Sequence, residues 1–145
     1  MKVIAPEKLH LSWEEVDAKI RSLCIKIAFM EWKFDRVVSI ANGGKYVGQA
    51  VANFFNVPHE SVRISRYDGE QKREEPIIEG ELTQATGNLV IDDLVDEGKT
   101  LDLFDKHFGL QGNKVAVLYH SPGAPKTYYN EVKPMAWLVF PWEEE

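Results

Sequence analysis

The stretch Asn88-Leu-Val-Ile-Asp92-Asp93-Leu-Val-Asp96-Glu-Gly98-Lys-Thr100 carries the strongest structural signal in the chain. An apolar run leads into two adjacent carboxylates, a third carboxylate follows, and Gly-Lys-Thr precedes an amphipathic segment. This order predicts a buried strand, an acidic strand end, a tight glycine turn and a helix start. Ligands of open α/β sheets bind at that edge, and main-chain N–H groups at a glycine turn and helix N-terminus bind phosphate. The stretch therefore predicts a sugar-phosphate site, in which carboxylates take hydroxyls or Mg²⁺ and amides take the phosphate.

Two other interpretations of this stretch compete with a ligand site. Its acids could merely cap a helix, but strands disfavour Asp, so adjacent Asp residues at a strand end are unusual for that role. The ending Gly98-Lys99-Thr100 also resembles a P-loop. The first glycine of the pattern Gly-x4-Gly-Lys-Ser/Thr would fall at position 93, which is Asp93, and the P-loop interpretation fails on that residue.

Length, composition and charge narrow the class of protein. The chain has 145 residues, of which 44% are apolar and 28% charged, and these values predict a single globular domain with a real core. We expect neither a membrane span nor a signal peptide, because no apolar run is long enough. A net charge of −6 argues against a nucleic-acid surface, which needs a basic face. The lone Cys24 cannot form an internal disulfide and is expected to be a packed thiol in a reducing compartment, so the expected location is cytoplasmic.

Hydrophobic periodicity predicts alternating strands and helices along the chain. Ser12 and Glu15 form a capping box at the start of a helix that should end near Trp32. Besides the quoted stretch, strands are expected at 36–41, 62–67, 76–78, 114–119 and 136–140, and helices at 46–54 and 101–108. Residues 68–75 are charged and lack apolar anchors, which predicts a mobile loop, and a Pro/Gly-rich loop is expected up to Lys126. The alternation predicts an α/β single domain with a mainly parallel twisted sheet flanked by helices.

A second glycine turn follows the predicted strand at 36–41. Gly43 and Gly44 let the backbone curl so that N–H groups converge on an anion, and the next helix adds its positive end. Alone, two glycines after a strand usually form only a tight turn. Together with the acidic strand end, the segment Asn42, Gly43, Gly44 and Lys45 becomes a candidate anion-binding loop.

The quoted stretch resembles the phosphoribosyl-pyrophosphate signature of the type I phosphoribosyltransferases. That signature is an apolar strand, two acids, two apolar residues and then Asp/Thr-Thr-Gly-x-Thr, with Glu97 here in place of the more usual Thr. The turn at Asn42 takes the place of the family's pyrophosphate loop, with Asn42 at its basic position. Residues 65–68 and the charged segment after them resemble a flexible lid, and 137–142 resembles the hood of the bacterial xanthine–guanine (hypoxanthine) phosphoribosyltransferases, which are the most similar group.

The resemblance implies a purine phosphoribosyltransferase built as one domain over residues 1–145, with a small C-terminal hood. Such an enzyme transfers ribose 5-phosphate from phosphoribosyl pyrophosphate to a 6-oxopurine (xanthine, guanine or hypoxanthine), forming the nucleoside monophosphate and pyrophosphate. It implies Mg²⁺ as cofactor, phosphoribosyl pyrophosphate and a purine base as partners, and a homodimer or homotetramer. Neither nucleic acid nor a membrane is an expected partner.

The same resemblance assigns a role to each residue of the motifs. Asp96 is the general base that accepts a proton from the ring nitrogen, and Asp92 and Asp93 face the ribose hydroxyls and Mg²⁺. Glu97, Gly98, Lys99 and Thr100 surround the 5-phosphate; Asn42, Gly43, Gly44 and Lys45 hold pyrophosphate; and Tyr67, Trp137 and Leu138 adjoin the substrate, with Trp137 stacked on the base.

Base recognition is where this chain departs most from the pattern. Purine members of the family carry a Lys that contacts the 6-oxo group, and the position that lines up here is Ser121. His120 and Lys126 are candidates to replace that cation. Together with Asn42 and Glu97, this departure leaves open a non-catalytic regulator that binds phosphoribosyl pyrophosphate or a nucleotide on the same fold, and also a transferase for another heterocycle.

Overall fold

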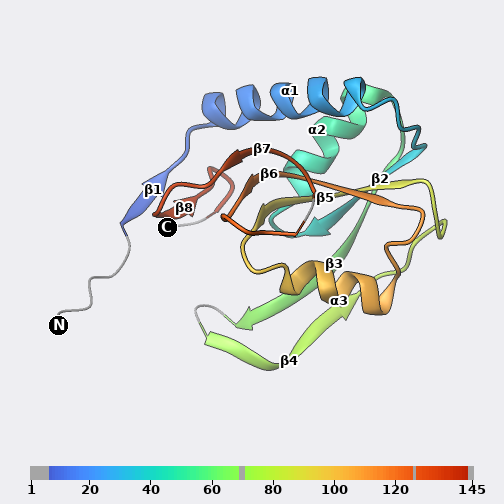
Figure 1. The fold of residues 1–145 in the computed structure, drawn as a ribbon. Helices are drawn as coiled ribbons and strands as arrows, with labels where there is room; N and C mark the ends of the chain where they lie inside the picture. The colour runs from blue at the N-terminus through green and yellow to red at the C-terminus, as the bar shows by residue number, and fades with distance from the viewer. Residues whose placement is uncertain (1–6, 69–70, 126, 144–145) are drawn as a thin grey trace.

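A six-stranded sheet forms the centre of the protein (Figure 1). The computed structural model describes residues 7–68, 71–125 and 127–143, apart from the side chains of residues 67, 68 and 71–73. The strand order is β4-β3-β2-β5-β6-β7, and every neighbouring pair is parallel except β3 with β4. The strands are β2 (Arg36–Ala41), β3 (His59–Asp68), β4 (Gln71–Glu79), β5 (Asn88–Val95), β6 (Lys114–His120) and β7 (Tyr128–Val132). The predicted α/β class and mainly parallel sheet are confirmed.

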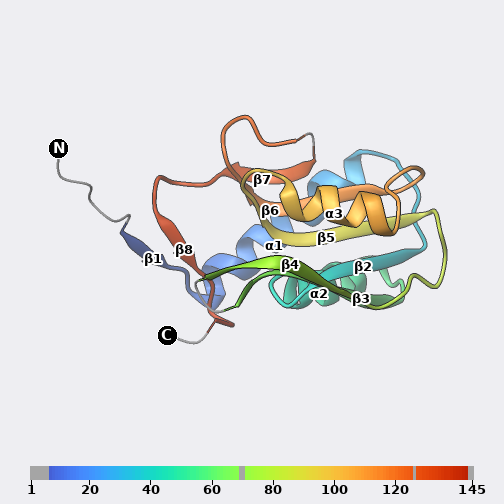
Figure 2. The same cartoon turned by 90° about the horizontal axis from the view of Figure 1, so that it is seen from below.

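Helices cover both faces of this sheet (Figures 1 and 2). The helices α1 (Trp13–Phe29) and α2 (Lys45–Phe55) pack on one face, and α3 (Lys99–His107) packs on the other. Successive residues of β5 alternate between the two layers, because side chains of a strand point to opposite faces: Leu89 packs with α1 and α2, and Val90 packs with α3. Because β5 is buried on both faces, its sequence is a continuous apolar run rather than an alternation of apolar and polar residues.

The start of α1 lies where its sequence predicts. The Ser12 hydroxyl accepts the main-chain N–H of Glu15 at 3.1 Å and donates to the Glu15 carboxylate at 3.1 Å. The Ser12 hydroxyl therefore satisfies one N–H that a helix N-terminus otherwise leaves open, but the Glu15 carboxylate accepts the Ser12 hydroxyl rather than the Ser12 main-chain N–H, so only half of the predicted capping box forms. Cys24 is fully buried in the core face of α1, and burial raises the pKa of its thiol to about 11. No helix of the described residues has the length and apolar character that a membrane span requires.

A separate two-stranded sheet forms the hood (Figure 2), which lies at the end of the main sheet where the parallel strands finish. It pairs β1 (Lys8–His10) in parallel with β8 (Trp137–Val139). The sequence predicts only the C-terminal half of this hood. The strand β1 has only three residues, all exposed, which is too short a segment for the alternation that marks a half-buried strand to be recognised.

Two predicted boundaries are wrong, and one strand was not predicted. Residues 71–75 were expected in a mobile loop but belong to the edge strand β4, which needs no apolar anchors because it pairs with β3 on one side only. The strand β7 has no predicted counterpart, because its residues are half-buried at the opposite edge. The first helix ends at Phe29 rather than near Trp32, and Glu31 takes a positive φ of 56° immediately after it.

The strand order creates a crevice between β2 and β5. The chain leaves β2 toward β3 on one side of the sheet and leaves β5 toward β6 on the other. The connections therefore diverge above the carboxyl ends of β2 and β5, which is where open α/β sheets bind ligands. The glycine turn after β2 and the acidic residues of β5 both lie at this point.

Candidate active site

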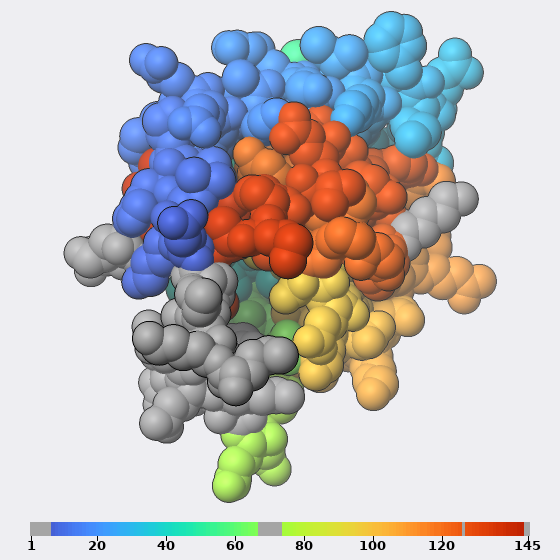
Figure 3. Space-filling view, turned by 60° about the vertical axis from the view of Figure 1, so that its left-hand side comes forward, coloured from blue at the N-terminus to red at the C-terminus, as the bar shows by residue number. Residues whose placement is uncertain are grey.

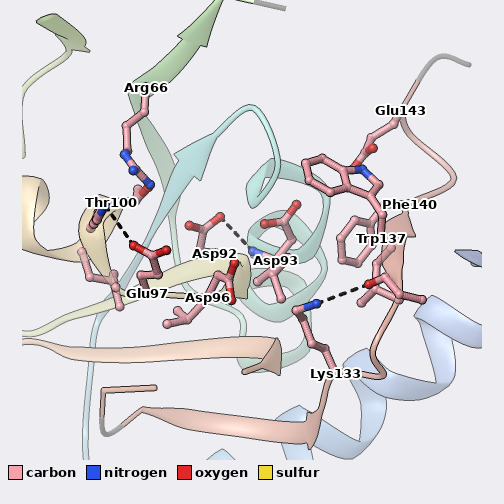
Figure 4. Close-up of a pocket in the computed structure, with 17 residues that line it drawn as sticks. Arg66, Asp92, Asp93, Asp96, Glu97, Thr100, Lys133, Trp137, Phe140 and Glu143 are labelled. Atoms are coloured by element: carbon pink, nitrogen blue, oxygen red, sulfur yellow. Dashed lines mark hydrogen bonds and ion pairs between the residues drawn. The ribbon is translucent and has the colours of Figure 1, made fainter. Parts of the chain in front are cut away.

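A cavity of about 300 Å³ opens at the carboxyl end of β5, between that strand, α3 and the hood (Figure 3). Figure 4 shows carboxylates from the β5 segment along one side of it and aromatic side chains of the hood on the other. The predicted site residues that line it are Asp92, Asp93, Asp96, Glu97, Gly98, Lys99, Thr100, Trp137 and Leu138. One cavity therefore brings together the acidic strand end, the glycine turn before α3 and the C-terminal tryptophan segment.

Asp92, which is buried, and Asp93, which is half-buried, form an acidic pair within β5. Asp92 is only 8% exposed, and its carboxylate accepts the main-chain N–H of Asp93 at 2.9 Å. Burial raises the pKa of Asp92 well above its ordinary value, and the neighbouring charge of Asp93 adds to this; burial also raises the pKa of Asp93. No lysine or arginine of the described residues forms an ion pair with either carboxylate. A buried and a half-buried acid without a cationic partner suit a ligand that supplies hydroxyls or positive charge.

This pair also fits a shared magnesium ion. The described residues hold no cluster of three His, Cys, Asp or Glu side chains arranged around a metal. Mg²⁺ is commonly held by one or two carboxylates, with substrate phosphates and waters completing its octahedron. Asp92 and Asp93 supply that number of protein ligands, so they would hold the ion together with a phosphorylated substrate.

The glycine turn after β2 lies directly against the acidic pair. A Cβ on Gly43 would lie 2.3 Å from Asp93 Oδ2, and a Cβ on Gly44 would lie 2.6 Å from the main-chain oxygen of Ile91. Neither glycine has a positive φ, so close approach to β5, rather than backbone conformation, is what requires glycine here. The two segments expected to form one site therefore do meet across the crevice.

Part of the expected anion-binding loop is already occupied by its own hydrogen bonds. The N–H of Gly44 donates to the Ile40 carbonyl at 2.9 Å, and the N–H of Lys45 donates to the Asn42 carbonyl at 3.2 Å. Neither amide is free to bind an anion in this conformation. The segment from Asn42 to Lys45 does not line the cavity; it adjoins it through Asp93.

The turn before α3 provides the second phosphate candidate. Gly98 adopts a left-handed conformation with φ of 83°, and a Cβ there would lie 2.6 Å from Pro125 Cγ. The first residues of α3, Lys99 and Thr100, line the cavity directly after it. The N-terminus of a helix carries open N–H groups and partial positive charge, so this corner is suited to a phosphate.

Glu97, the acid at the usual Thr position, is neutralised locally. Its carboxylate is 2.9 Å from the Lys99 ammonium. This hydrogen bond and the charge of Lys99 lower the pKa of Glu97, and the charge of Arg66 contributes in the same direction. The negative charge of Glu97 at the cavity rim is therefore balanced by Lys99, so the corner at the start of α3 is not strongly negative.

Asp96 accepts a hydrogen bond from Ser121, the residue at the position where the resemblance implies a lysine. The Ser121 hydroxyl donates to an Asp96 carboxylate oxygen, and the Ser121 N–H donates to the Val95 carbonyl at 2.9 Å. His120 is buried, its Nδ1 lies 3.0 Å from the Ser121 carbonyl oxygen, and its ring packs on Tyr129, so it does not reach the cavity. Lys126 and the Tyr67 side chain lie outside the described part of the chain.

The hood wall contains the predicted aromatic surface and several residues that sequence reasoning missed. Trp137 is 62% exposed and Leu138 is buried beneath it. The cavity-lining residues not singled out as site residues from the sequence include Arg66, Lys133, Ala136, Phe140 and Glu143. A lone lysine before a Pro-Met-Ala-Trp segment is the only sequence signal for Lys133, and it matches no motif.

Comparisons with known proteins agree with this geometry. The family described as phosphoribosyl transferase domain matches residues 12–144. A xanthine-guanine phosphoribosyltransferase of Desulfotalea psychrophila is 28% identical over 145 residues, covering 93% of this chain and 86% of that protein. The crystal structure of a purine phosphoribosyltransferase from Pyrococcus horikoshii has a TM-score of 0.79 at 28% identity, covering 96% and 95% of the two chains. A Helicobacter pylori xanthine-guanine-hypoxanthine phosphoribosyltransferase, 20% identical over 94% of each chain, shares the fold with a TM-score of 0.75.

Proposed function

Because this chain belongs to the phosphoribosyl transferase domain family, we propose that it transfers ribose 5-phosphate from phosphoribosyl pyrophosphate to a ring nitrogen of a 6-oxopurine. Its class, a transferase of the purine phosphoribosyltransferase type, is the one predicted from the sequence and is confirmed by the family match and the relatives. The base would be xanthine, guanine or hypoxanthine, and the products a nucleoside monophosphate and pyrophosphate. We also expect a cytoplasmic homo-oligomer.

The observation that carries this proposal is the meeting of Asp93 with Gly43 above the crevice. It sets the adjacent acids Asp92 and Asp93 beside two glycines, within reach of the N-terminus of α3. A pentose that carries a phosphate at one end and a pyrophosphate at the other needs these features together. The acids would face its hydroxyls, and Thr100 and its neighbours would hold the 5-phosphate. The pyrophosphate would lie beside the turn after β2, where the Gly44 and Lys45 amides would have to exchange their internal hydrogen bonds to bind it.

The chemistry assigned to the side chains is a substitution at C1 of the ribose. The bond from C1 to the pyrophosphate oxygen breaks, a bond from the purine nitrogen to C1 forms, and the proton of that nitrogen passes to the Asp96 carboxylate. Mg²⁺, when bound, supplies charge that stabilises the leaving pyrophosphate. Trp137 would hold the purine by stacking, which aligns its nitrogen with C1.

Ser121 is placed to orient the proposed base. Its hydroxyl donates to one oxygen of Asp96, so the other oxygen remains available to a purine N–H. Asp96 is exposed and lines the cavity, so its second carboxylate oxygen can be reached by a bound base. Serine at position 121 would therefore fix the orientation of the Asp96 carboxylate, and it removes a cation from the base-recognition surface.

Release of pyrophosphate tests the proposal. The purified chain is incubated with Mg²⁺, phosphoribosyl pyrophosphate and, one at a time, xanthine, guanine, hypoxanthine, adenine, uracil and orotate. Release that depends on a 6-oxopurine supports the proposal, and release only with another base would move the assignment to a different heterocycle.

A second candidate function is a non-catalytic regulator that binds phosphoribosyl pyrophosphate or a nucleotide. The internal hydrogen bonds of the Gly44 and Lys45 amides favour it, because these amides do not point to an incoming pyrophosphate. Micromolar binding of phosphoribosyl pyrophosphate without pyrophosphate release for any base would support this candidate over the enzyme.

A further inference from the structure

Lys133, which has no role assigned above, lies between Asp96, the proposed general base, and the aromatic wall. It follows β7, and its N–H donates to the His120 carbonyl at 2.7 Å, which ties the main chain at this position to the end of β6. Its side chain lines the main cavity and also a neighbouring cavity of about 370 Å³, and Asp96, Ala136 and Trp137 line both as well. Figure 4 shows the Lys133 ammonium on the side of the cavity between Asp96 and Trp137.

The ammonium of Lys133 is held only weakly. It donates to the Ala136 carbonyl at 3.3 Å and to the Pro134 carbonyl at 3.5 Å, both longer than an ordinary hydrogen bond. Both partners are neutral, and no carboxylate of the described residues forms an ion pair with Lys133. Since an ammonium has three donors, one N–H has no partner among the described residues. Lys99 differs in this respect, because its charge is matched by Glu97 at 2.9 Å.

We propose that Lys133 recognises the exocyclic oxygen of the base by donating a hydrogen bond from its ammonium group; this deepens the proposed function and rests on it. The base would lie against Trp137, with its ring nitrogen toward Asp96 and its carbonyl oxygen toward Lys133. Ser121 is already engaged with Asp96, and His120 is turned into the core, so neither takes this role.

Two physical consequences follow from an ammonium at this place. A lysine can donate but cannot accept a hydrogen bond, so it favours a ring carbonyl over a ring amino group. In addition, when the ring nitrogen gives its proton to Asp96, negative charge spreads onto the conjugated oxygen, and Lys133 stabilises it. Lys133 therefore determines specificity for oxopurines and assists the proton transfer.

The test compares two lysines with matched surroundings. Lys133→Met removes the ammonium but keeps an unbranched side chain. Lys26→Met is the control, because the Lys26 ammonium also donates to two main-chain carbonyls, those of Asn130 at 2.9 Å and Tyr129 at 3.3 Å, but lies outside the cavity. For each variant, kcat and KM are measured with hypoxanthine, guanine and adenine, and KM is measured for phosphoribosyl pyrophosphate.

We expect Lys133→Met to lower kcat/KM for hypoxanthine and guanine by about 10- to 100-fold, the usual effect of losing a hydrogen bond to a charged group. Activity with adenine and KM for phosphoribosyl pyrophosphate should change by less than about twofold. Lys133→Arg should recover part of the loss, and Lys26→Met should behave as wild type. Selective loss for oxygen-bearing bases separates recognition from a merely structural role.

Two results would overturn the assignment of Lys133. One is unchanged kcat/KM for oxopurines in Lys133→Met; the other is an equal loss for every base and for phosphoribosyl pyrophosphate. Absence of turnover in the wild-type chain would instead refute the proposed function. In that case, isothermal titration with inosine monophosphate decides: binding about tenfold weaker in Lys133→Met than in Lys26→Met supports base recognition, and equal binding refutes it.

Discussion

Replacing Asp92 with asparagine should stabilise the unliganded protein, although Asp92 belongs to the proposed active site. Asp92 is 8% exposed, stands next to Asp93 and has no cationic partner among the described residues. Burial therefore raises the pKa of its carboxyl in the folded protein. Asparagine has nearly the same shape, retains an oxygen to accept the Asp93 N–H at 2.9 Å, and carries no charge.

The sign of the pH dependence follows from that raised pKa. The folded state holds the Asp92 proton more tightly than the unfolded state, so this group contributes full stability below its unfolded pKa. The contribution is lost as the pH rises through its folded pKa. Asparagine does not titrate, so the Asp92→Asn variant does not undergo the loss of stability that the wild type undergoes when Asp92 ionises. Relief of a buried, unpaired carboxylate is worth about 1 to 3 kcal/mol, and a domain of this size gains about 4 °C in Tm for each kcal/mol.

Thermal unfolding of the apo protein measures the effect. Wild type, Asp92→Asn and the control Asp102→Asn, an exposed acid on α3, are compared at about pH 5 and about pH 8. We expect a higher Tm for Asp92→Asn at the higher pH, a smaller difference at the lower pH, and no gain for Asp102→Asn. An Asp92→Asn protein that is less stable than wild type at the higher pH would refute the view of Asp92 as an unpaired buried acid.

Three further substitutions test separate parts of the site. Asp96→Asn should lower kcat by about a hundredfold or more while phosphoribosyl pyrophosphate still binds in isothermal titration, and full turnover would remove Asp96 from the mechanism. Gly44→Ala should lower the free energy of unfolding by about 1 to 3 kcal/mol in urea, because its Cβ would lie 2.6 Å from the Ile91 carbonyl oxygen; unchanged stability would disprove that close approach. Glu97→Thr should lower KM for phosphoribosyl pyrophosphate by about two- to fivefold in steady-state kinetics, because it releases Lys99 to the phosphate, and an increased KM would contradict this.

The features that local chemistry determines could be predicted from the sequence. The bounds of β2 agree with the β-branched run at 36–41, and Ser12 caps the first helix as predicted. The approach of Asp93 to Gly43 follows from one rule, that parallel strands end at the same edge of a sheet. Periodicity and turn residues were sufficient for these features because they depend on near neighbours in the chain.

The features that depend on distant segments could not be predicted. The hood needs β1 to pair with β8 across almost the whole chain, and nothing in three exposed residues signals that pairing. The hydrogen bond from Ser121 to Asp96 and the position of Lys133 depend on how β6 and β7 finish beside β5. These contacts form between loops, where neither periodicity nor a motif constrains the side chains.

The most direct test of the account measures how phosphoribosyl pyrophosphate binds, since the central claim is that the acids of β5 and the glycine turn form a pocket for a phosphorylated pentose. Isothermal titration is performed on wild type and on the double variant Asp92→Asn, Asp93→Asn, each with Mg²⁺ and with the metal chelated. We predict Mg²⁺-dependent binding to wild type and at least about tenfold weaker binding to the double variant. Equal affinity in the two proteins, or binding to wild type that is indifferent to Mg²⁺, would contradict the account.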